Sequence, residues 1–101
     1  MSYYVIGDED TVLGFSLVGV PGSVVDTVEQ AREAFVSAVK AQTARIVVLT
    51  EKTGDMIRQE VQRQIFSKSF PLVVEIPDRN GPLPGKKPIS QMITEAIGVK
   101  I

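Results

Sequence analysis

The chain of 101 residues contains no cysteine, no histidine and no tryptophan. Without cysteine it has no disulfide, no thiolate nucleophile and no cysteine-ligated zinc site. Without histidine it lacks the usual general base near neutral pH and the commonest metal ligand, so hydrolases of the Ser-His-Asp and Cys-His types are excluded. These absences favour binding or assembly over catalysis, and we expect no catalytic, cofactor-binding or metal-binding residues.

A surplus of charge of one sign and a long apolar run are also missing. Eleven Lys and Arg face twelve Asp and Glu, whereas nucleic-acid-binding proteins carry a basic surplus that neutralises phosphate, so we expect no nucleic-acid partner. No segment approaches the roughly 20 apolar residues that span a bilayer. Residues 1–8 lack the basic lead and apolar run of a secretory signal. We therefore expect a cytoplasmic protein without direct membrane insertion.

Four short apolar runs have the character of β-strands. Residues 3–7 are rich in aromatic and β-branched side chains, and the runs 45–50 and 71–76 are continuous rather than alternating in hydrophobicity. Continuous runs are typical of parallel strands covered on both faces. The stretch 17–25 is weaker because two glycines and a proline interrupt it, and this fits a short edge strand.

Apolar residues recur at helical spacing in three segments between these runs, namely 11–19, 28–39 and 51–67. Candidate N-caps stand at their starts: Asp10 or Thr11, Asp26 or Thr27, and Thr50. Alternating strands and helices predict an α/β fold. With right-handed crossovers, the expected architecture is a small flavodoxin-like (Rossmann-like) four-stranded parallel sheet flanked by helices.

The character of the chain changes after residue 76. Residues 77–88 hold four of the six prolines, so we predict an extended, semi-rigid linker. In residues 89–101 apolar side chains recur at helical spacing along one face: Ile89, Met92, Ile93, Ala96 and Ile97. The predicted organisation is an α/β globular domain over 1–76, the linker, and a C-terminal amphipathic helix that binds a partner.

This C-terminal helix has two interpretations. In one, it folds back and covers the sheet as an ordinary part of the core. In the other, the linker carries it away, and another chain must bury its apolar face, because a helix of about ten residues is not stable alone in water. The linker of 12 residues is longer than most connections inside a compact domain, and this favours the second interpretation.

The acidic run Asp8-Glu9-Asp10 follows the first predicted strand, where open parallel sheets bind ligands. Its oxygens suit Mg2+, as in a receiver-like signalling module, but they also suit capping of the next helix. A receiver needs an aspartate at the end of a central strand, and here Thr50-Glu51 stands there. A flavodoxin-like module that binds a small ligand is the other alternative, although no dinucleotide or Walker motif is present.

Four segments, 7–20, 46–51, 71–77 and 96–99, occur in an order and with residues that together resemble the F subunit of the V-type and archaeal A-type ATPases. The resemblance spans nearly the whole chain. It implies a small α/β protein with an extended C-terminal helix, which belongs to the central stalk of a rotary ATPase or ATP synthase. In that family ATP chemistry takes place in other subunits.

The resemblance further implies a rotor role and a set of partners. The D subunit, a long coiled coil, would be the direct partner, with the catalytic A/B ring and the membrane-sector connecting subunit as further neighbours. Rotation would couple ATP hydrolysis or synthesis to H+ or Na+ transport, at the membrane periphery. The helix near 11–18 would add contacts. The partner-binding residues that we predict are Ile89, Met92, Ile93, Ala96, Ile97, Arg79, Lys86 and Lys87.

Overall fold

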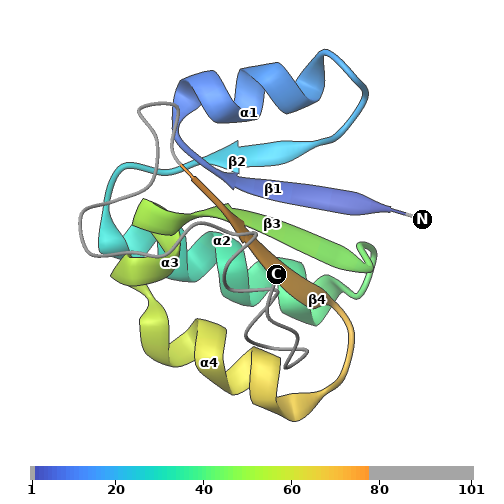
Figure 1. Ribbon diagram of the computed structural model, residues 1–101, viewed down its shortest axis with the longest axis vertical. Coiled ribbons are helices and arrows are strands. Elements are labelled where there is room, and N and C mark those ends of the chain that lie inside the picture. The colour runs from blue at the N-terminus through green and yellow to red at the C-terminus, as the bar shows by residue number, and fades with distance from the viewer. Residues whose placement is uncertain (1, 78–101) are drawn as a thin grey trace, which may run out of the picture.

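The computed structural model describes residues 2–77, which form a four-stranded parallel sheet between two layers of helices (Figure 1). The strands run in the order β2-β1-β3-β4, with every neighbouring pair parallel. The elements in chain order are β1 (Tyr3–Gly7), α1 (Glu9–Ser16), β2 (Gly22–Val24), α2 (Val28–Ala41), β3 (Ile46–Thr50), α3 (Glu51–Met56), α4 (Arg58–Ser67) and β4 (Leu72–Ile76). This is the flavodoxin-like order, and it confirms the predicted α/β fold.

The two faces of the sheet are covered unequally. Helices α2, α3 and α4 lie on one face, and α1 alone lies on the other, over β1 and β2 (Figure 1). The main core fills the space between the three-helix layer and the sheet, and its buried members are Ile6, Val25, Ala31, Phe35, Val47, Leu49, Ile57 and Val61. The sequence period explains this core, since alternate residues of β1 and β3 share one face with the apolar sides of α2 and α4.

On the α1 face, one row of paired residues crosses from β1 to β4 and becomes steadily more exposed. Val5 pairs with Val48, and Val48 pairs with Val74. Their exposed fractions are 0%, 6% and 43%. The cover that α1 gives to β1 therefore does not extend to β4 within the described residues, and an apolar strip of β4 is left accessible there.

Helix α1 begins earlier than the sequence pattern indicated. Asp8 caps it, and neither Asp10 nor Thr11 does, because the Asp8 carboxylate accepts hydrogen bonds from the Thr11 backbone N–H (3.2 Å) and from the Thr11 hydroxyl (2.6 Å). The helix ends at Ser16, three residues before the expected Gly19. Gly19 instead takes a positive φ of 86° in the turn towards β2, a conformation that suits glycine.

Helix α2 starts at the second of its two candidate caps. The Thr27 hydroxyl accepts from the Gln30 backbone N–H (3.1 Å), and the Gln30 side chain accepts in return from the Thr27 backbone N–H (3.3 Å). This reciprocal capping box satisfies two backbone donors that a helix start leaves free. The pair fixes where α2 departs from the edge of the sheet.

The prediction of a single helix over 51–67 is wrong, because the segment forms two helices. Thr50 caps α3 as predicted, but the backbone at Ile57 leaves helical geometry, with φ −128° and ψ 41°. Ile57 is 1% exposed and belongs to the main core. The break directs the Ile57 side chain into the core beneath the sheet. Apolar residues spaced by four are expected both in one straight helix and in two helices joined by such a break, so the sequence pattern does not distinguish these arrangements.

Of the remaining predictions, those for the strands can be compared with the structure, and those for the C-terminal region mostly cannot. The runs at 3–7, 45–50 and 71–76 form strands within one residue of the expected bounds, and the weak stretch 17–25 yields only a three-residue edge strand. The predicted helix over 89–101 lies outside the described residues, as does the linker apart from its first residue, Pro77.

Candidate protein interface

The carboxyl ends of β1 and β3, where a flavodoxin-like sheet would bind a ligand, are occupied by the chain's own side chains. A Cβ atom added at Gly7 would lie 2.9 Å from Cγ2 of Thr50. The Thr50 hydroxyl caps α3, accepting from the Thr53 backbone N–H (3.2 Å) and donating to the Thr53 hydroxyl (2.8 Å). Both threonines are buried. The crevice between these two strands is thus filled with satisfied hydroxyl groups.

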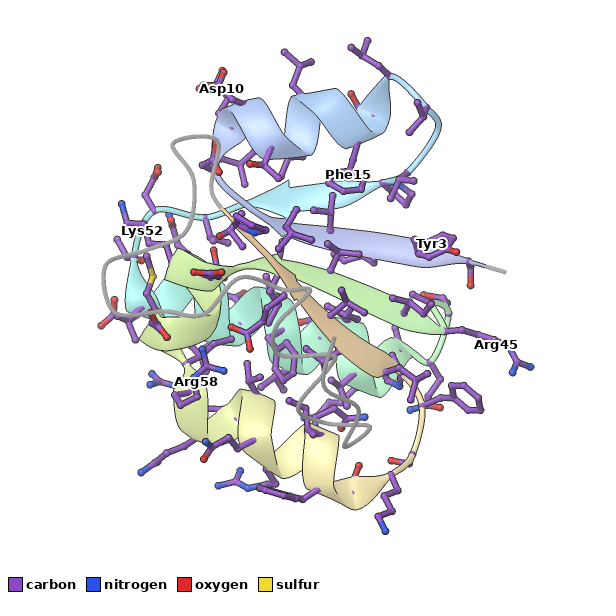
Figure 2. The ribbon with its side chains drawn as sticks, viewed as in Figure 1. Tyr3, Asp10, Phe15, Arg45, Lys52 and Arg58 are labelled. Atoms are coloured by element: carbon purple, nitrogen blue, oxygen red, sulfur yellow. The ribbon has the colours of Figure 1, made fainter. Side chains whose placement is uncertain are left out.

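An arginine clamp closes the carboxyl end of β4. The Arg58 guanidinium donates to both carboxylate oxygens of Glu75, at 2.8 and 2.7 Å, and to Asp55 at 2.8 Å. The hydrogen bonds that Arg58 donates to Glu75, and to a lesser degree to Asp55, raise the pKa of Arg58 above its usual value, although partial burial opposes this. Gly54 allows the clamp to close, because a Cβ atom there would lie 2.3 Å from Glu75 Oε1. Arg58 and Asp10 both lie on the left in Figure 2, on the side of the strand carboxyl ends, with Asp10 at the top and Arg58 lower down.

The acidic run after β1 serves the start of α1. The hydrogen bond from the Thr11 hydroxyl lowers the pKa of the Asp8 carboxyl group, against the opposing effect of partial burial. Within residues 2–77, no three or more of the metal-ligating residue types lie close enough together to hold a metal ion. The arrangement gives the receiver-like alternative no support in this part of the chain.

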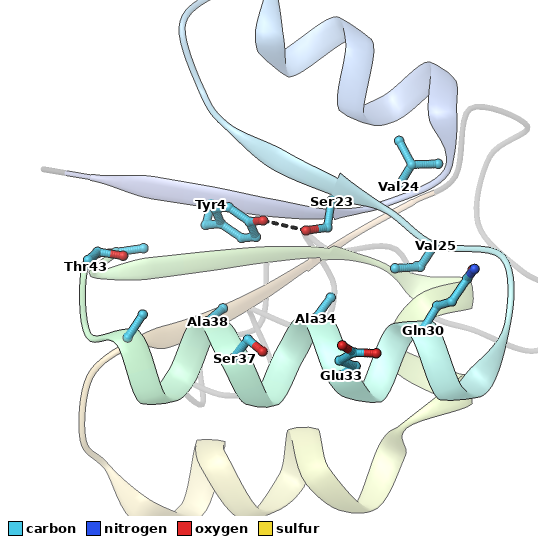
Figure 3. Close-up of a pocket in the computed structure, with 12 residues that line it drawn as sticks. Tyr4, Ser23, Val24, Val25, Gln30, Glu33, Ala34, Ser37, Ala38 and Thr43 are labelled. Carbon is cyan, nitrogen blue, oxygen red and sulfur yellow. Dashed lines mark hydrogen bonds between the residues drawn. The ribbon is translucent and has the colours of Figure 1, made fainter.

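An open groove of about 500 Å³ lies beside the edge strand β2 (Figure 3). One wall is the small-residue side of α2, with Ala34 and Ala38. On the other side Tyr4 and Ser23 are joined by a hydrogen bond between their hydroxyl groups. The groove combines apolar walls with hydroxyl groups and runs along the side of the sheet, between β2 and α2.

The most exposed apolar side chains of the first half of the chain lie on α1 and directly after it. Leu13 is 58% exposed, Leu17 80% and Val18 77%. On the sheet side of the same helix, Phe15 points towards β2 (Figure 2) and is half-buried. We call Leu13, Leu17 and Val18 the α1 apolar patch. Contiguous exposed apolar residues of this kind commonly mark a protein interface.

The structure places none of the partner-binding residues predicted from the sequence, because Ile89, Met92, Ile93, Ala96, Ile97, Arg79, Lys86 and Lys87 all lie outside the described residues. Sequence reasoning anticipated α1 as a contributing element, and Leu17 and Val18 belong to the segment 11–19 in which it recognised apolar residues at helical spacing. Both are exposed: Leu17, the C-cap of α1, follows Leu13 on the outer side of the helix, and Val18 lies beyond the helix end. Among the described residues, no helix has the length and apolar character needed to cross a membrane.

Comparison with known proteins identifies what this chain resembles. Residues 4–93 match the family model described as ATP synthase (F/14-kDa) subunit. The chain belongs to this family. It is 37% identical over 99 residues to the F subunit of the A-type ATP synthase of Methanothermobacter thermautotrophicus, a match covering 96% of this chain and 92% of the relative. It is 32% identical over 106 residues to the corresponding F subunit of Thermococcus sibiricus, covering 100% and 98% respectively.

Membership in the F/14-kDa subunit family confirms the resemblance that the sequence motifs indicated. The chain is part of an A-type ATP synthase complex and is not itself the catalytic chain. The occupied strand ends agree with that assignment, since the position where related folds bind cofactors is used here for caps and the arginine clamp.

Proposed function

We propose that this chain is a central-stalk protein of the rotary ATP synthase and that it binds the coiled-coil D subunit through apolar surfaces. The single observation that carries the proposal is the family match over residues 4–93, which includes part of the predicted C-terminal helix. In this role it helps couple ATP hydrolysis or synthesis in the catalytic A/B ring to H+ or Na+ transport. It would work at the cytoplasmic periphery of the membrane, with the membrane-sector connecting subunit as a further neighbour.

Two surfaces would share the contact with the D subunit. The predicted helix over 89–101 would lay its apolar stripe along the coiled coil, and Arg79, Lys86 and Lys87 would pair with acidic residues of neighbouring chains. The α1 apolar patch supports an additional contact, because Leu13 and Leu17 are spaced by four residues and lie on one side of a helix. Side chains of this kind fit between the ridges of a second helix.

The transmission of torque requires a stiff body more than a reactive one, and two features of the described fold support such a role. The arginine clamp joins the start of α4 to the end of β4, and the capping box fixes the start of α2. No bond is made or broken on this chain in the proposed role. Its contribution is to bind its neighbours through packed surfaces while the stalk turns.

The C-terminal contact is tested by coexpression with the D subunit and gel filtration. The double substitution Ile93→Asp and Ile97→Asp places charge on the predicted stripe and should abolish coelution, because burying an unpaired carboxylate at an interface costs several kcal/mol. A matched control, Ser90→Asp with Thr94→Asp, adds the same charge on the polar side of the same helix and should leave the complex intact. If the first pair coelutes as well as the control, this helix is not the anchor.

The contribution of α1 is tested separately with Leu17→Asp. Because Leu17 is 80% exposed, the melting temperature of the isolated chain should change little, while affinity for the D subunit should fall about tenfold, as for loss of one interface anchor. Ser16→Asp, at the neighbouring exposed position, is the control. An unchanged affinity for Leu17→Asp would remove α1 from the interface.

A further inference from the structure

Charge is separated along the strand direction. Every Asp and Glu of residues 2–77 lies at the carboxyl ends of the strands or in the helices and loops that begin there, and the segments 40–49 and 61–74 contain none. Figure 2 shows Asp10 and Arg58 at one end of the molecule and Tyr3 and Arg45 at the other. Acids near helix starts and bases near helix ends are favoured by the helix dipole.

Four cations lie at or near the amino ends of β3 and β4: Lys40, Arg45, Arg63 and Lys68. The ion pairs seen between described residues use other arginines, Arg32 with Glu60 and Arg58 with Asp55 and Glu75. Glu60 lies beside Arg63 and Lys40 and pairs with Arg32. The cations around this end still outnumber that carboxylate, and the excess creates a local positive field on a protein whose net charge is negative.

Two exposed aromatic rings lie at this same end. Phe66, in the last turn of α4, is 77% exposed, and Phe70, just before β4, is 48% exposed. The Arg45 guanidinium lies over the Phe70 ring, 4.8 Å from its centroid. Lys68 stands between the two rings in the chain. Aromatic and arginine side chains are the residue types that most often carry interface energy. We call Arg45, Arg63, Phe66, Lys68 and Phe70 the basic aromatic patch.

The loop that presents these rings is held in place by amide side chains from two helices. Gln64 donates to the carbonyl oxygens of Ser69 (3.1 Å) and Pro71 (2.9 Å), and Gln42 donates to that of Phe70 (3.2 Å). The Ser67 hydroxyl adds a bond to the Gln64 carbonyl at 2.6 Å. A loop ordered before binding loses little conformational freedom when a partner docks.

We infer that the basic aromatic patch is a docking surface for a second protein partner, an amphipathic helix whose apolar stripe is flanked by carboxylates. Apolar side chains of such a helix would cover Phe66 and Phe70, and its Asp or Glu residues would face Arg45, Arg63 and Lys68. This surface is separate from the α1 apolar patch, since it lies on α4 and the loop before β4. It gives the chain one contact more than those proposed for the D subunit.

The test measures binding of two labelled synthetic helical peptides to the full-length chain by fluorescence anisotropy. One peptide has a leucine stripe flanked by glutamates, and the other has lysines in place of the glutamates. The glutamate peptide should bind at least about tenfold more tightly, and its Kd should rise with salt. Phe66→Ser and Arg63→Glu should each weaken binding about tenfold, whereas Leu17→Ser, in the other patch, should not.

Circular dichroism checks that the variants fold, as expected for side chains that are exposed in the structure. Equal affinity for the two peptides, or unchanged affinity in both patch variants, would overturn the inference. Stronger binding to phosphatidylserine vesicles than to the glutamate peptide would also overturn it, because the surface would then recognise a membrane. The isolated chain is used, so the result is independent of whether the D subunit binds.

Discussion

At the scale of single residues, the two glycines at positions 14 and 22 have opposite roles. A Cβ atom at Gly22 would lie 2.4 Å from Val5 Cγ1 and 2.5 Å from the Val5 carbonyl oxygen, whereas Gly14 has no atom within 4 Å of that position. Gly22→Ala should therefore lower the free energy of unfolding by about 1–3 kcal/mol through overpacking. Gly14→Ala, in α1, should raise it by about 0.5–1 kcal/mol.

Chemical denaturation of both variants measures this difference. Equal effects of the two substitutions would mean that β2 does not approach β1 and α1 as closely as the structure shows. The comparison is informative because both substitutions add the same methyl group to a glycine, and only the surroundings differ.

Asp8 makes a pH-dependent contribution to stability. Its pKa is lowered in the folded chain, chiefly by the Thr11 hydroxyl, so its carboxylate stabilises the fold above the unfolded pKa of about 3.9 and this contribution is lost as the pH falls through the folded value. Asp8→Asn keeps a good N-cap but removes the titration. The stability difference between the two proteins should shrink as the pH drops from about 5 to about 3.

Urea denaturation across that pH range provides the measurement. Thr11→Val removes the main cause of the lowered pKa and should flatten the pH dependence in the same direction. A constant difference between Asp8→Asn and the unsubstituted protein at every pH would show that the capping carboxylate does not titrate with the fold.

At the scale of elements, the junction between α3 and α4 depends on one side chain. Ile57 is 1% exposed, while Ile65, the same residue type in the same segment, is 46% exposed. Ile57→Ala should cost about 2–5 kcal/mol, as expected for a large-to-small change in a core. Ile65→Ala should cost clearly less. Thermal unfolding of the two variants makes the comparison, and equal losses would contradict the position of the break.

The arginine clamp is the second device at this scale, since it joins α4 to β4. Arg58→Met and Glu75→Gln should each destabilise the fold, and the double variant should lose less than the sum, with a coupling of about 0.5–3 kcal/mol. The side chains are 30% and 17% exposed, which places the pair between surface and buried behaviour. Additive losses in a double-mutant cycle would mean that the bidentate contact contributes nothing.

The elements also show where sequence reasoning was sufficient. Three apolar runs became strands, one predicted from its aromatic and β-branched content and two from their continuous hydrophobicity, and the order of the sheet followed from alternation and handedness. The break at Ile57 could not be obtained in this way, and the cap at Asp8 was only one of several candidates. A spacing of four fits one straight helix or two bent ones, and three acidic residues in a row offer three equivalent caps until the Thr11 contacts are known.

At the scale of the whole molecule, one candidate interface was found from the sequence and two were found only from the structure. The C-terminal stripe is visible in the sequence as a period, whereas the α1 apolar patch and the basic aromatic patch are not. Leu17 and Phe66 look like core residues in a pattern and become surface residues only once the helix ends and the fold are known. The assignment to a rotary complex came from sequence motifs and relatives, since the fold and its packing do not by themselves identify binding partners.

The central claim is that this chain is a rotor component bound to the D subunit within an A-type ATP synthase. Native affinity purification of the tagged full-length chain, followed by quantitative mass spectrometry, tests it most directly. We predict recovery of the D subunit in equal molar amount, together with the catalytic A and B subunits, and loss of all three when Ile93→Asp and Ile97→Asp are combined. Recovery of the unsubstituted chain without the D subunit would contradict the account.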